Sequence, residues 1–597
     1  MIVIISDLHL QHTALDGVRR EEAGRVLETR VPRNVGAGAL ALLFSELVQN
    51  AQRCSAKEVH LIFAGDIFEL HRTPLWFVGG EPLRPTLHPA ASSAVLEQRV
   101  LAILAAIERD NREFFQALSD FMKSRELVRR GAVRRLSDIP LIPHYIPGNH
   151  DRLAQCWPST RQRVRELLCI PTENAQLRAR FPHQLEWSHQ AGYGVRVRHG
   201  HEYDPSNFSE AFDPAQQPSD EAYEKPALGD YVTVEVATRL AVAFRAHYAR
   251  ELRKPGAEGE PYRRIYAAVT EFDDVRPQSK LVRYLVETLG LREGTTLAIL
   301  RPVLRDVFDT ALSDSYFMSE AGPALTQFAG KGLVELLTLV ERFGRGSERA
   351  GPAQVARKEP GLDTGEVSLI VAGHTHEPDH VALPGRKLAW GLRDEAYFLD
   401  SGTWRTRIDA GEGGAFGRLR SYTMIFCYHD DELRSGERRR FETWTGHLQA
   451  EDYGPVLSRE IVFAARSPMQ VVRCLSCRVQ HVDEGETADG AELVLTFGVD
   501  GSGQQLAFRG VHDGDTLAFP EGTLLAVDPA LDGELWCYGV EQDLGGSLLD
   551  RDDPLPWAVA FLERVGEREA APFRAQALEL RAADNRGNAF TLSFEVL

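Results

Sequence analysis

Five short segments of the chain carry the side chains that bind divalent cations and move protons. In chain order they are SDLHL (6–10), AGDIFEL (64–70), GNHD (148–151), RHGHEYD (198–204) and AGHTH (372–376). Carboxylate, amide and imidazole groups suit Mn, Fe, Zn, Co or Ni, whereas the lack of thiolates disfavours an iron–sulfur cluster. The first expectation is therefore a site for transition metal ions.

The spacing within the segments supports this expectation. Asp7 and His9 stand two residues apart, as do His374 and His376. Residues two apart in an extended segment point to the same side, so each pair can hold a ligand from one face. Each of the last four segments also has a glycine beside its polar residues, where it permits a sharp turn or a close backbone approach.

The elements around the segments predict how they meet. Strand-like runs end at the first three segments, and helical patterns over 39–51 and 92–124 separate these runs. This β-α-β-α-β order predicts a layered α/β core with right-handed crossovers. Ligands bind at the carboxyl ends of the strands in such sheets, so we expect the five segments to converge on one crevice.

The rest of the chain divides into two further parts. Helical periodicity dominates 205–360 and predicts an inserted helical subdomain or cap. Its clearest stretches are 234–252, 279–290 and 325–343. Short strand-like runs separated by Gly and Asp predict a C-terminal β-sandwich over 455–597. The α/β domain that carries the polar segments is then formed by 1–204 and 361–454.

Charge and cysteine usage limit the function classes. The chain has 68 Lys and Arg against 86 Asp and Glu, a net charge of −18, which opposes non-specific binding to a phosphate backbone. A nucleic-acid partner would therefore need a local basic groove. The seven cysteines are dispersed and do not resemble a disulfide framework. We expect a cytoplasmic protein without a membrane span, because no apolar run reaches about 18 residues.

Taken in order, the five segments resemble the motif blocks of the calcineurin-like metallophosphoesterase superfamily. Those blocks are D-x-H, GD, GNH[DE], a single H and GHxH, and this chain has all five between Asp7 and His376. The resemblance covers roughly the first 450 residues apart from the insertion. It implies a four-layer α/β/β/α sandwich for the α/β domain and a centre of two divalent metal ions.

The resemblance also implies which residues bind each metal ion. One metal ion is expected on Asp7, His9, Asp66 and His376. The second is expected on Asp66, Asn149, His199 and His374, so that Asp66 bridges the two. His201 is the alternative to His199. Manganese is the expected metal, with Fe, Zn, Co and Ni as alternatives.

The implied reaction is hydrolysis of a phosphoester by a hydroxide that bridges the two metal ions. His150 matches the family's general acid, and Glu69 matches the position of an acidic partner that orients it. A histidine at this place favours a phosphodiester, because a poor leaving group needs a proton. Protein phosphatases carry GDxVDRG and GNHE, whereas this chain has GDIFELH and GNHD, which disfavours phosphoproteins.

Two alternatives remain beside a phosphodiesterase. One is an SbcD-like nuclease in a repair or defence complex, and the other is a non-catalytic scaffold with the same fold. The expected substrate is a phosphorylated small molecule or a nucleotide, with nucleic acid as an alternative. The C-terminal module is the expected surface for a protein partner.

Several further residues favour structural roles. We expect His71 and Arg72 on a helix surface, with contact to a substrate phosphate as the alternative. We expect Arg405 to be a structural arginine beside Trp404, with substrate binding as the alternative. Cys474 and Cys477 would point to opposite faces of a strand, so a zinc site there is disfavoured. The acidic loop with Asp550, Asp552 and Asp553 is expected to be solvated, with a calcium loop as the alternative.

Overall fold

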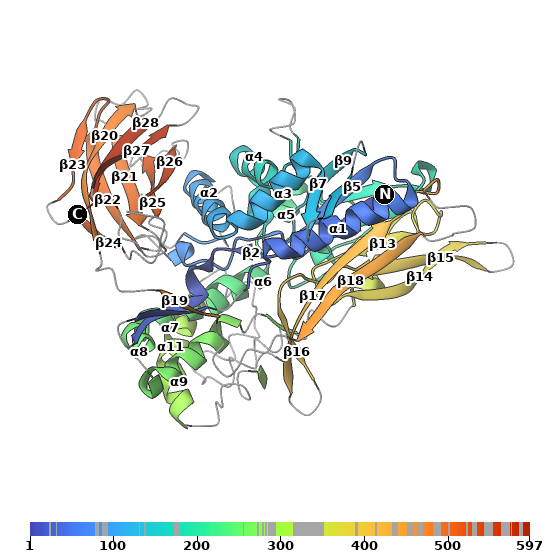
Figure 1. The fold of residues 1–597 in the computed structure, drawn as a ribbon, viewed down its shortest axis with the longest axis horizontal. Coiled ribbons are helices and arrows are strands. Elements are labelled where there is room, and N and C mark those ends of the chain that lie inside the picture. Colours follow the sequence, from blue (N-terminus) through green and yellow to red (C-terminus); the bar gives the residue numbers. More distant parts are fainter. Residues whose placement is uncertain are drawn as a thin grey trace.

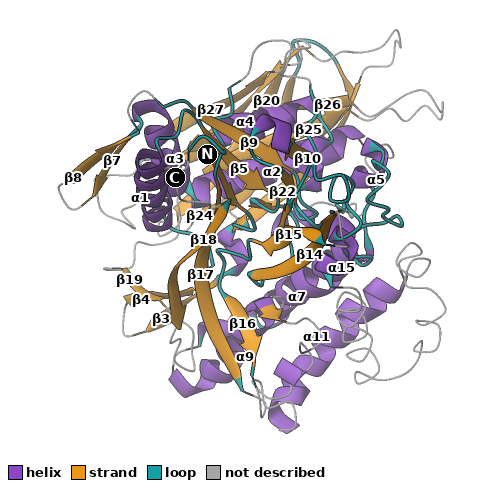
Figure 2. Ribbon diagram, turned by 90° about the vertical axis from the view of Figure 1, so that its right-hand side faces the viewer, coloured by secondary structure: helices purple, strands orange, loops and turns teal. Residues whose placement is uncertain are grey.

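A computed structural model shows a mixed α/β protein with several sheets (Figures 1 and 2). It describes Met1–Leu597 except for residues 23–24, 31–32, 78–82, 86–92, 130–131, 137–138, 172–178, 255, 272–273, 277–279, 281–282, 285–293, 314–350, 389–391, 412–414, 433–439, 451–458, 464–469, 482–490, 500–501, 521–522, 528–533, 542–552, 563–573, 575, 584–588 and 597. No helix among the described residues has the length and apolarity needed to cross a bilayer.

The largest sheet contains the N-terminal strand. Its order is β12 (Val275–Arg276), β16 (Arg407–Ala410), β17 (Phe416–Cys427), β1 (Ile2–Ile5), β5 (Val59–Ala64) and β9 (Leu141–Ile146), with β18 (Phe441–Ala450) also beside β17. β1, β5 and β9 run parallel, whereas β17 is antiparallel to β1. The three predicted strands before the first three polar segments therefore lie side by side.

A second sheet carries the last two polar segments. Its order is β10 (Gln184–Trp187), β11 (Val195–Arg198), β13 (Leu369–Ala372), β15 (Arg393–Asp400) and β14 (Asp379–Lys387). β11, β13 and β15 run parallel. The side chains of Ile4 and Ile62 from the first sheet share one buried cluster with Val197 and Val371 from the second, so the two sheets pack face to face.

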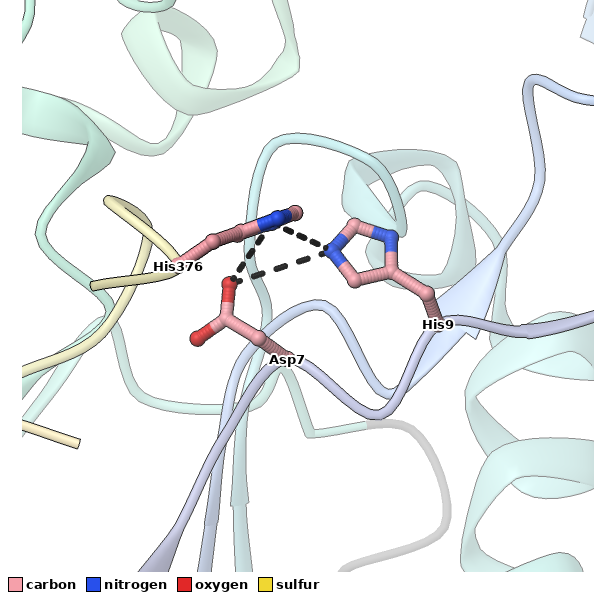
Figure 3. Close-up of side chains that lie close together, drawn as sticks. All are labelled: Asp7, His9 and His376. Atoms are coloured by element: carbon pink, nitrogen blue, oxygen red, sulfur yellow. Dashed lines mark hydrogen bonds and ion pairs between the residues drawn. The ribbon is translucent and has the colours of Figure 1, made fainter. Parts of the chain in front are cut away.

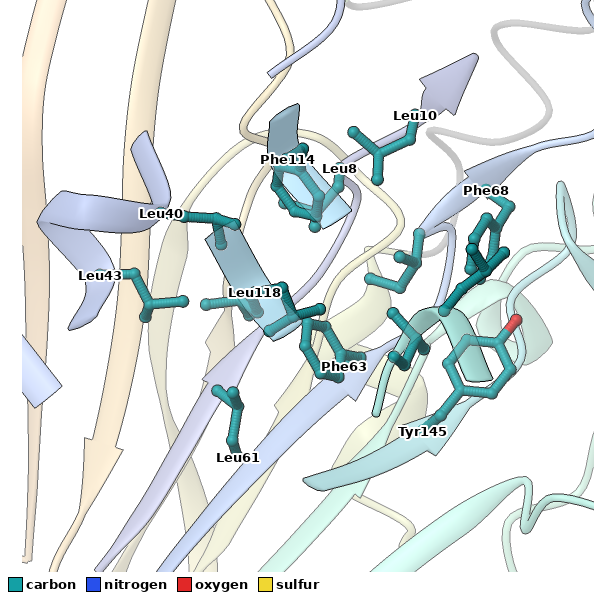
Figure 4. Close-up of a cluster of buried hydrophobic side chains, with 14 of the residues drawn as sticks. Leu8, Leu10, Leu40, Leu43, Leu61, Phe63, Phe68, Phe114, Leu118 and Tyr145 are labelled. Atoms are coloured by element: carbon teal, nitrogen blue, oxygen red, sulfur yellow. The ribbon is translucent and has the colours of Figure 1, made fainter. Parts of the chain in front are cut away.

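The outer face of the first sheet is covered by helices. Val3 and Ile5 belong to a different cluster from Ile4, because successive side chains of a strand point to opposite faces. The helices that share this cluster are α1 (Ala37–Cys54), α2 (Ser93–Asp110), α3 (Arg112–Ser124) and α4 (Pro158–Leu167). Figure 4 shows Leu40 and Leu43 of α1 near Leu118 of α3, above β5. α1 ends at Cys54, and the next residue, Ser55, adopts a left-handed conformation.

The outer face of the second sheet has a smaller cover. The 3-10 turn η6 (His201–Tyr203) and α15 (Pro352–Ala356) lie against it. Tyr203 and Ala356 pack there on Ile370 and Phe398 of the sheet. In the sequence, η6 directly precedes the helical insertion and α15 lies near the insertion's C-terminal end, so both ends of the insertion lie on this side of the second sheet.

The insertion forms its own helical cluster. Its elements are α5 (Asp220–Glu224), α6 (Leu228–Tyr231), the π-helical stretch η7 (Val232–Thr238), α7 (Arg239–His247), α8 (Ala249–Arg253), α9 (Gly256–Glu271) and α11 (Gly294–Ser313). Phe244, Ile265 and Leu300 share one core with Ile408 of β16. The helical pattern over 234–252 corresponds to three elements of the structure, η7, α7 and α8. The helix predicted over 325–343, and most of that over 279–290, lie outside the described residues.

The C-terminal residues form two sheets around one apolar cluster (Figure 1). One contains β23 (Thr516–Ala518), β20 (Gln470–His481), β28 (Ala589–Val596) and β27 (Ala577–Ala583), with β24 (Leu524–Val527) also beside β20; the other contains β22 (Ser502–Val511), β21 (Ala491–Val499), β25 (Glu534–Glu541) and β26 (Asp553–Phe561). Cys474 and Cys477 both lie in this cluster. The prediction of opposite faces is wrong because the pairing register shifts between Cys474 and Ser476.

Short pairings complete the described part. β3 (Gly17–Glu22) and β4 (Arg25–Arg30) form a hairpin that β19 (Arg459–Phe463) extends. β7 (Glu126–Arg129) pairs with β8 (Ala132–Arg135), and β2 (Leu10–Gln11) pairs with β6 (Phe68–Glu69). Asp550 and Asp552 of the acidic C-terminal loop lie outside the described residues.

Candidate metal centre

The five polar segments follow five strands directly. Asp7, Asp66 and Asn149 come after β1, β5 and β9, while His199 and His374 come after β11 and β13. Because the strands within each group are parallel, these ends share one edge of each sheet. The two sheets face each other, and their two edges meet in one buried polar cluster.

Backbone hydrogen bonds join the first two segments beyond the end of the sheet. The amide of Asp7 donates to the carbonyl of Gly65 at 3.0 Å, and that of His9 donates to the carbonyl of Asp66 at 2.9 Å. The short parallel pairing of β2 with β6 continues this register. The two segments therefore enter the site as one unit.

The backbone at the site is strained. Among the described residues, eight non-glycine residues have a positive φ, and five of them are Asp7 (52°), His9 (44°), Asp66 (52°), His374 (74°) and His376 (66°). A left-handed conformation costs roughly 1–2 kcal/mol for such residues and gathers at functional sites. The two spaced pairs are thus not extended as the sequence spacing predicted, and the left-handed turns set their side-chain directions.

One donor set consists of Asp7, His9 and His376, which point toward one another in Figure 3. The Nε2 atoms of the two histidines are 2.9 Å apart, and Asp7 Oδ1 lies 3.5 Å from His376 Nε2. His9 Nδ1 donates to Glu69, which leaves Nε2 as its ligand atom. When two donors each lie about 2.1 Å from a cation and the donor–cation–donor angle is about 90°, the donors are about 3 Å apart. The spacing in this set therefore fits a metal ion.

A second donor set consists of Asp66, His199 and His374. Asp66 Oδ2 is 3.1 Å from His199 Nε2 and 3.7 Å from His9 Nε2, so it lies between the two sets. This oxygen is buried, and its nearest ring nitrogen is the Nε2 of His199. A cation bound between the two donor sets would take the place of the proton on that nitrogen.

Asn149 completes the second set. Its Oδ1 lies 3.1 Å from His374 Nδ1 and 3.3 Å from His199 Nε2. His374 Nε2 donates to Asp204, so the Nδ1 of the neutral ring presents a lone pair to the amide oxygen. Two lone pairs that face one another fit a cation between them. The residues present therefore fit two metal ions with nitrogen and oxygen ligands.

A hydrogen-bonded ring holds these two ligands. Asn149 Nδ2 donates to Asn207 Oδ1 at 3.4 Å, and Asn207 Nδ2 donates to Asp204 Oδ2 at 2.7 Å. The same carboxylate accepts from His374 at 3.2 Å. Partners of this kind fix the tautomer of a ligating histidine and the orientation of an amide. Asp204 and Asn207 were not among the predicted site residues, although the DPSN turn directly after RHGHEY indicates a polar loop at this place.

Asp151 fixes the GNHD loop. Its Oδ1 accepts from the amide of Gly148 at 2.6 Å, and its Oδ2 accepts from the amide of Ile67 at 2.9 Å. Burial and the nearby Asp66 raise the pKa of Asp151 to about 6. A Cβ at Gly148 would meet Asp66 Oδ1 at 2.2 Å, so only glycine allows this approach.

Glu69 connects a metal ligand with the candidate proton donor. Its carboxylate accepts from Nδ1 of His150 and from Nδ1 of His9, each at 3.0 Å. Burial opposes the charge of Glu69, but the charge of His150 and these hydrogen bonds hold its pKa well below the ordinary value. Burial lowers the pKa of His150, and the carboxylates of Glu69 and Asp66 outweigh it and raise this pKa to about 10. The predicted pair is therefore in contact.

The pKa values of Asp66 and His199 are also shifted by their contact with each other. Burial alone would raise the pKa of Asp66, but the charges of His199 and His150 hold it well below the usual range. Burial lowers the pKa of His199, whereas its contact with Asp66 raises this pKa to about 10. The metal-free cluster therefore holds a proton on His199 where a cation would otherwise stand.

Other predicted residues lie around the cluster. His201 is buried near His199, with ring centroids 5.3 Å apart, but it is outside both donor sets. His71 and Arg72 are buried, so the predicted helix-surface role is wrong: Arg72 donates to the carbonyl of Thr270 in the insertion. Arg405 is buried with its Nε 2.9 Å from Asp274 Oδ1, which agrees with a structural arginine.

Comparisons with known proteins add no family. No protein-family model matches the chain, and no curated protein matches it in sequence.

Proposed function

We propose that this chain hydrolyses phosphodiester bonds at a site that holds two divalent cations. The observation that carries the proposal is that two separate donor sets meet at Asp66, whose buried Oδ2 lies 3.1 Å from His199 Nε2 and 3.7 Å from His9 Nε2. The first cation would be held by Asp7, His9, Asp66 and His376, and the second by Asp66, Asn149, His199 and His374. The mixed nitrogen and oxygen ligands suit Mn²⁺, with Fe, Zn, Co and Ni as alternatives.

Bound there, the cations would supply positive charge that polarises the phosphoryl oxygens and acidifies an attacking water molecule. The chain's own contribution is the placement of a proton. His150 is less buried than its neighbours, and its Nδ1 is held by Glu69. This leaves Nε2 to give a proton to the leaving oxygen, which matters most for the poor leaving group of an alkyl diester.

The fold supports the same proposal. Helices cover one sheet, the two sheets pack on each other, and η6 with α15 covers the far face. This order agrees with the four-layer sandwich of the calcineurin-like metallophosphoesterases, to which we assign the α/β domain within this proposal. The helical insertion and a C-terminal β-sandwich are then additions to that domain. A cytoplasmic location and a protein partner at the C-terminal part also belong to the proposal.

The proposal is tested by hydrolysis assays with titrated Mn²⁺. The substrates are bis-p-nitrophenyl phosphate, p-nitrophenyl phosphate, a cyclic nucleotide and DNA. Asp66→Asn is expected to abolish Mn²⁺-dependent turnover of every substrate. His150→Ala is expected to slow an alkyl diester by roughly 10²- to 10⁴-fold and to affect nitrophenyl esters much less, because nitrophenolate leaves without a proton.

Matched controls are two exposed residues, Asp363 and His247. Asp363→Asn and His247→Ala should leave all rates unchanged. Wild-type protein without Mn²⁺-dependent hydrolysis, or Asp66→Asn with wild-type activity, would contradict the proposed function.

A further inference from the structure

The insertion places an arginine at the edge of the metal centre. β12 pairs with β16, so that Arg276 lies opposite Asp409 in the sheet of the α/β domain. Asp274, the residue before β12, forms ion pairs with Arg33 at 2.8 Å and with Arg405 at 2.9 Å. The backbone that carries Arg276 is therefore anchored on both sides.

The contact of Arg276 with His376 fixes the tautomer of that histidine. Its Nη2 lies 2.7 Å from His376 Nδ1 and is buried. A guanidinium group only donates, so Nδ1 accepts and the proton of the neutral ring is on Nε2. The Nε2 atoms of His376 and His9 lie 2.9 Å apart, and His9 Nδ1 donates to Glu69.

Metal binding is incompatible with this arrangement. A cation between His9 and His376 needs the lone pair of each Nε2 atom, so the proton of His376 must move to Nδ1. Nδ1–H and the guanidinium are both donors, and the contact between them is lost. Neighbouring arginines are not affected in this way, because Arg407 donates to the carbonyl oxygen of His376 and contacts Asp409.

We propose that Arg276, supplied by the helical insertion, binds the non-bridging phosphoryl oxygens of the substrate once the set of Asp7, His9 and His376 holds a cation. This inference rests on the proposed function. Phosphoryl oxygens are the acceptors that a guanidinium group binds best, and binding to them replaces the lost contact with His376. The insertion thereby contributes to substrate recognition in a chain whose net charge is −18.

The inference predicts opposite effects on two ligands. Isothermal titration calorimetry measures Mn²⁺ binding, and then the binding of dimethyl phosphate to the Mn²⁺-loaded protein. Arg276→Met should bind Mn²⁺ about two- to tenfold more tightly at the site that His9→Ala removes, because a competing hydrogen bond is gone. The same variant should bind dimethyl phosphate about tenfold or more weakly, because a charge-assisted contact is lost.

Arg407→Met is the matched control, since Arg407 also contacts His376 but through its backbone. Both dissociation constants should stay within about twofold of wild type for this variant. Arg276→Lys keeps the charge and tests the proposal should the methionine variant not fold. It should bind dimethyl phosphate more weakly than wild type, because lysine lacks the bidentate fork.

The outcomes separate the inference from the proposed function. Wild-type protein that binds Mn²⁺ and cleaves diesters, with a folded Arg276→Met that binds dimethyl phosphate as tightly as wild type, would overturn the inference alone. Weaker Mn²⁺ binding by Arg276→Met would also overturn it and make Arg276 a support for His376. Absence of Mn²⁺ binding by the wild type would overturn both.

Discussion

Asp204 lies 3.2 Å from Nε2 of His374 and decides which nitrogen of that ring faces the metal centre. The carboxylate is itself held by the side chain of Asn207 and by the amide of Ser206 at 2.8 Å. A ligand that is orientated before the cation arrives loses less conformational freedom on binding. The second donor set therefore depends on a residue that touches no expected metal ion.

Asp204→Asn should weaken Mn²⁺ binding at the second donor set by roughly 10- to 100-fold, because an amide can present its NH₂ group to His374 and release the required tautomer. Calorimetric titration with Mn²⁺ measures the effect. Asp213→Asn, in an exposed turn, is the control. Equal Mn²⁺ affinities for Asp204→Asn and wild type would remove this role.

Gly148→Ala should disturb the bridging carboxylate. A Cβ there would meet Asp66 Oδ1 at 2.2 Å and the Asp66 amide nitrogen at 2.6 Å, so the loop must shift. We expect a loss of roughly 1–3 kcal/mol in the free energy of unfolding, together with weaker Mn²⁺ binding. Gly36→Ala places its Cβ in open space and serves as the control in urea denaturation. A Gly148→Ala protein with wild-type stability would show that the loop accommodates a Cβ at this position without destabilising the fold.

Mn²⁺ should stabilise the fold, because the two donor sets exist only in the folded chain. At a free Mn²⁺ concentration of 100 times the dissociation constant, one site adds about 2.7 kcal/mol to the free energy of unfolding. Thermal unfolding with Mn²⁺ and with EDTA measures this difference. Mn²⁺ should raise the melting temperature of Asp66→Asn only slightly, whereas it should raise that of Asp363→Asn as much as that of the wild type. A melting temperature that does not respond to Mn²⁺ would speak against the metal centre.

Buried His12 should make the protein less stable in mild acid. Its Nδ1 is 2.8 Å from Thr73 Oγ1, and burial lowers its pKa from 6.5 to about 4. Between these two pH values the unfolded chain binds the proton and the folded chain does not. Stability from this group is therefore complete above pH 6.5 and falls by about 3 kcal/mol as the pH drops to 4.

The check is urea denaturation of wild type and His12→Asn at pH 7 and pH 4.5. Other buried histidines contribute to both proteins, so the difference between their pH dependences isolates His12. His12→Asn should lose less stability over this range than wild type. An equal loss of unfolding free energy in the two proteins between pH 7 and pH 4.5 would show that protonation of His12 does not destabilise the fold.

The sequence predicted the ligand types and the strand ends that carry them, because both are local properties. Asp66, Asn149 and His374 follow buried apolar runs, and parallel strands bring such ends together. Arg276 and Asp204 could not be assigned in this way. Arg276 depends on where a distant insertion adds one short strand, and Asp204 acts through His374. The inward turn of both Cys474 and Cys477 depends on a register shift that a regular alternation does not contain.

The left-handed backbone at five of the candidate ligands has an evolutionary consequence. Glycine at any of these positions would relax the main chain, so selection for stability alone would favour it over aspartate or histidine. Aspartate or histidine at all five positions therefore requires a role other than stability, which the proposed metal centre supplies. A homologue that binds no cations would carry glycine at the positions of Asp7, Asp66 or His376. Its melting temperature would be higher than that of this protein in its metal-free form.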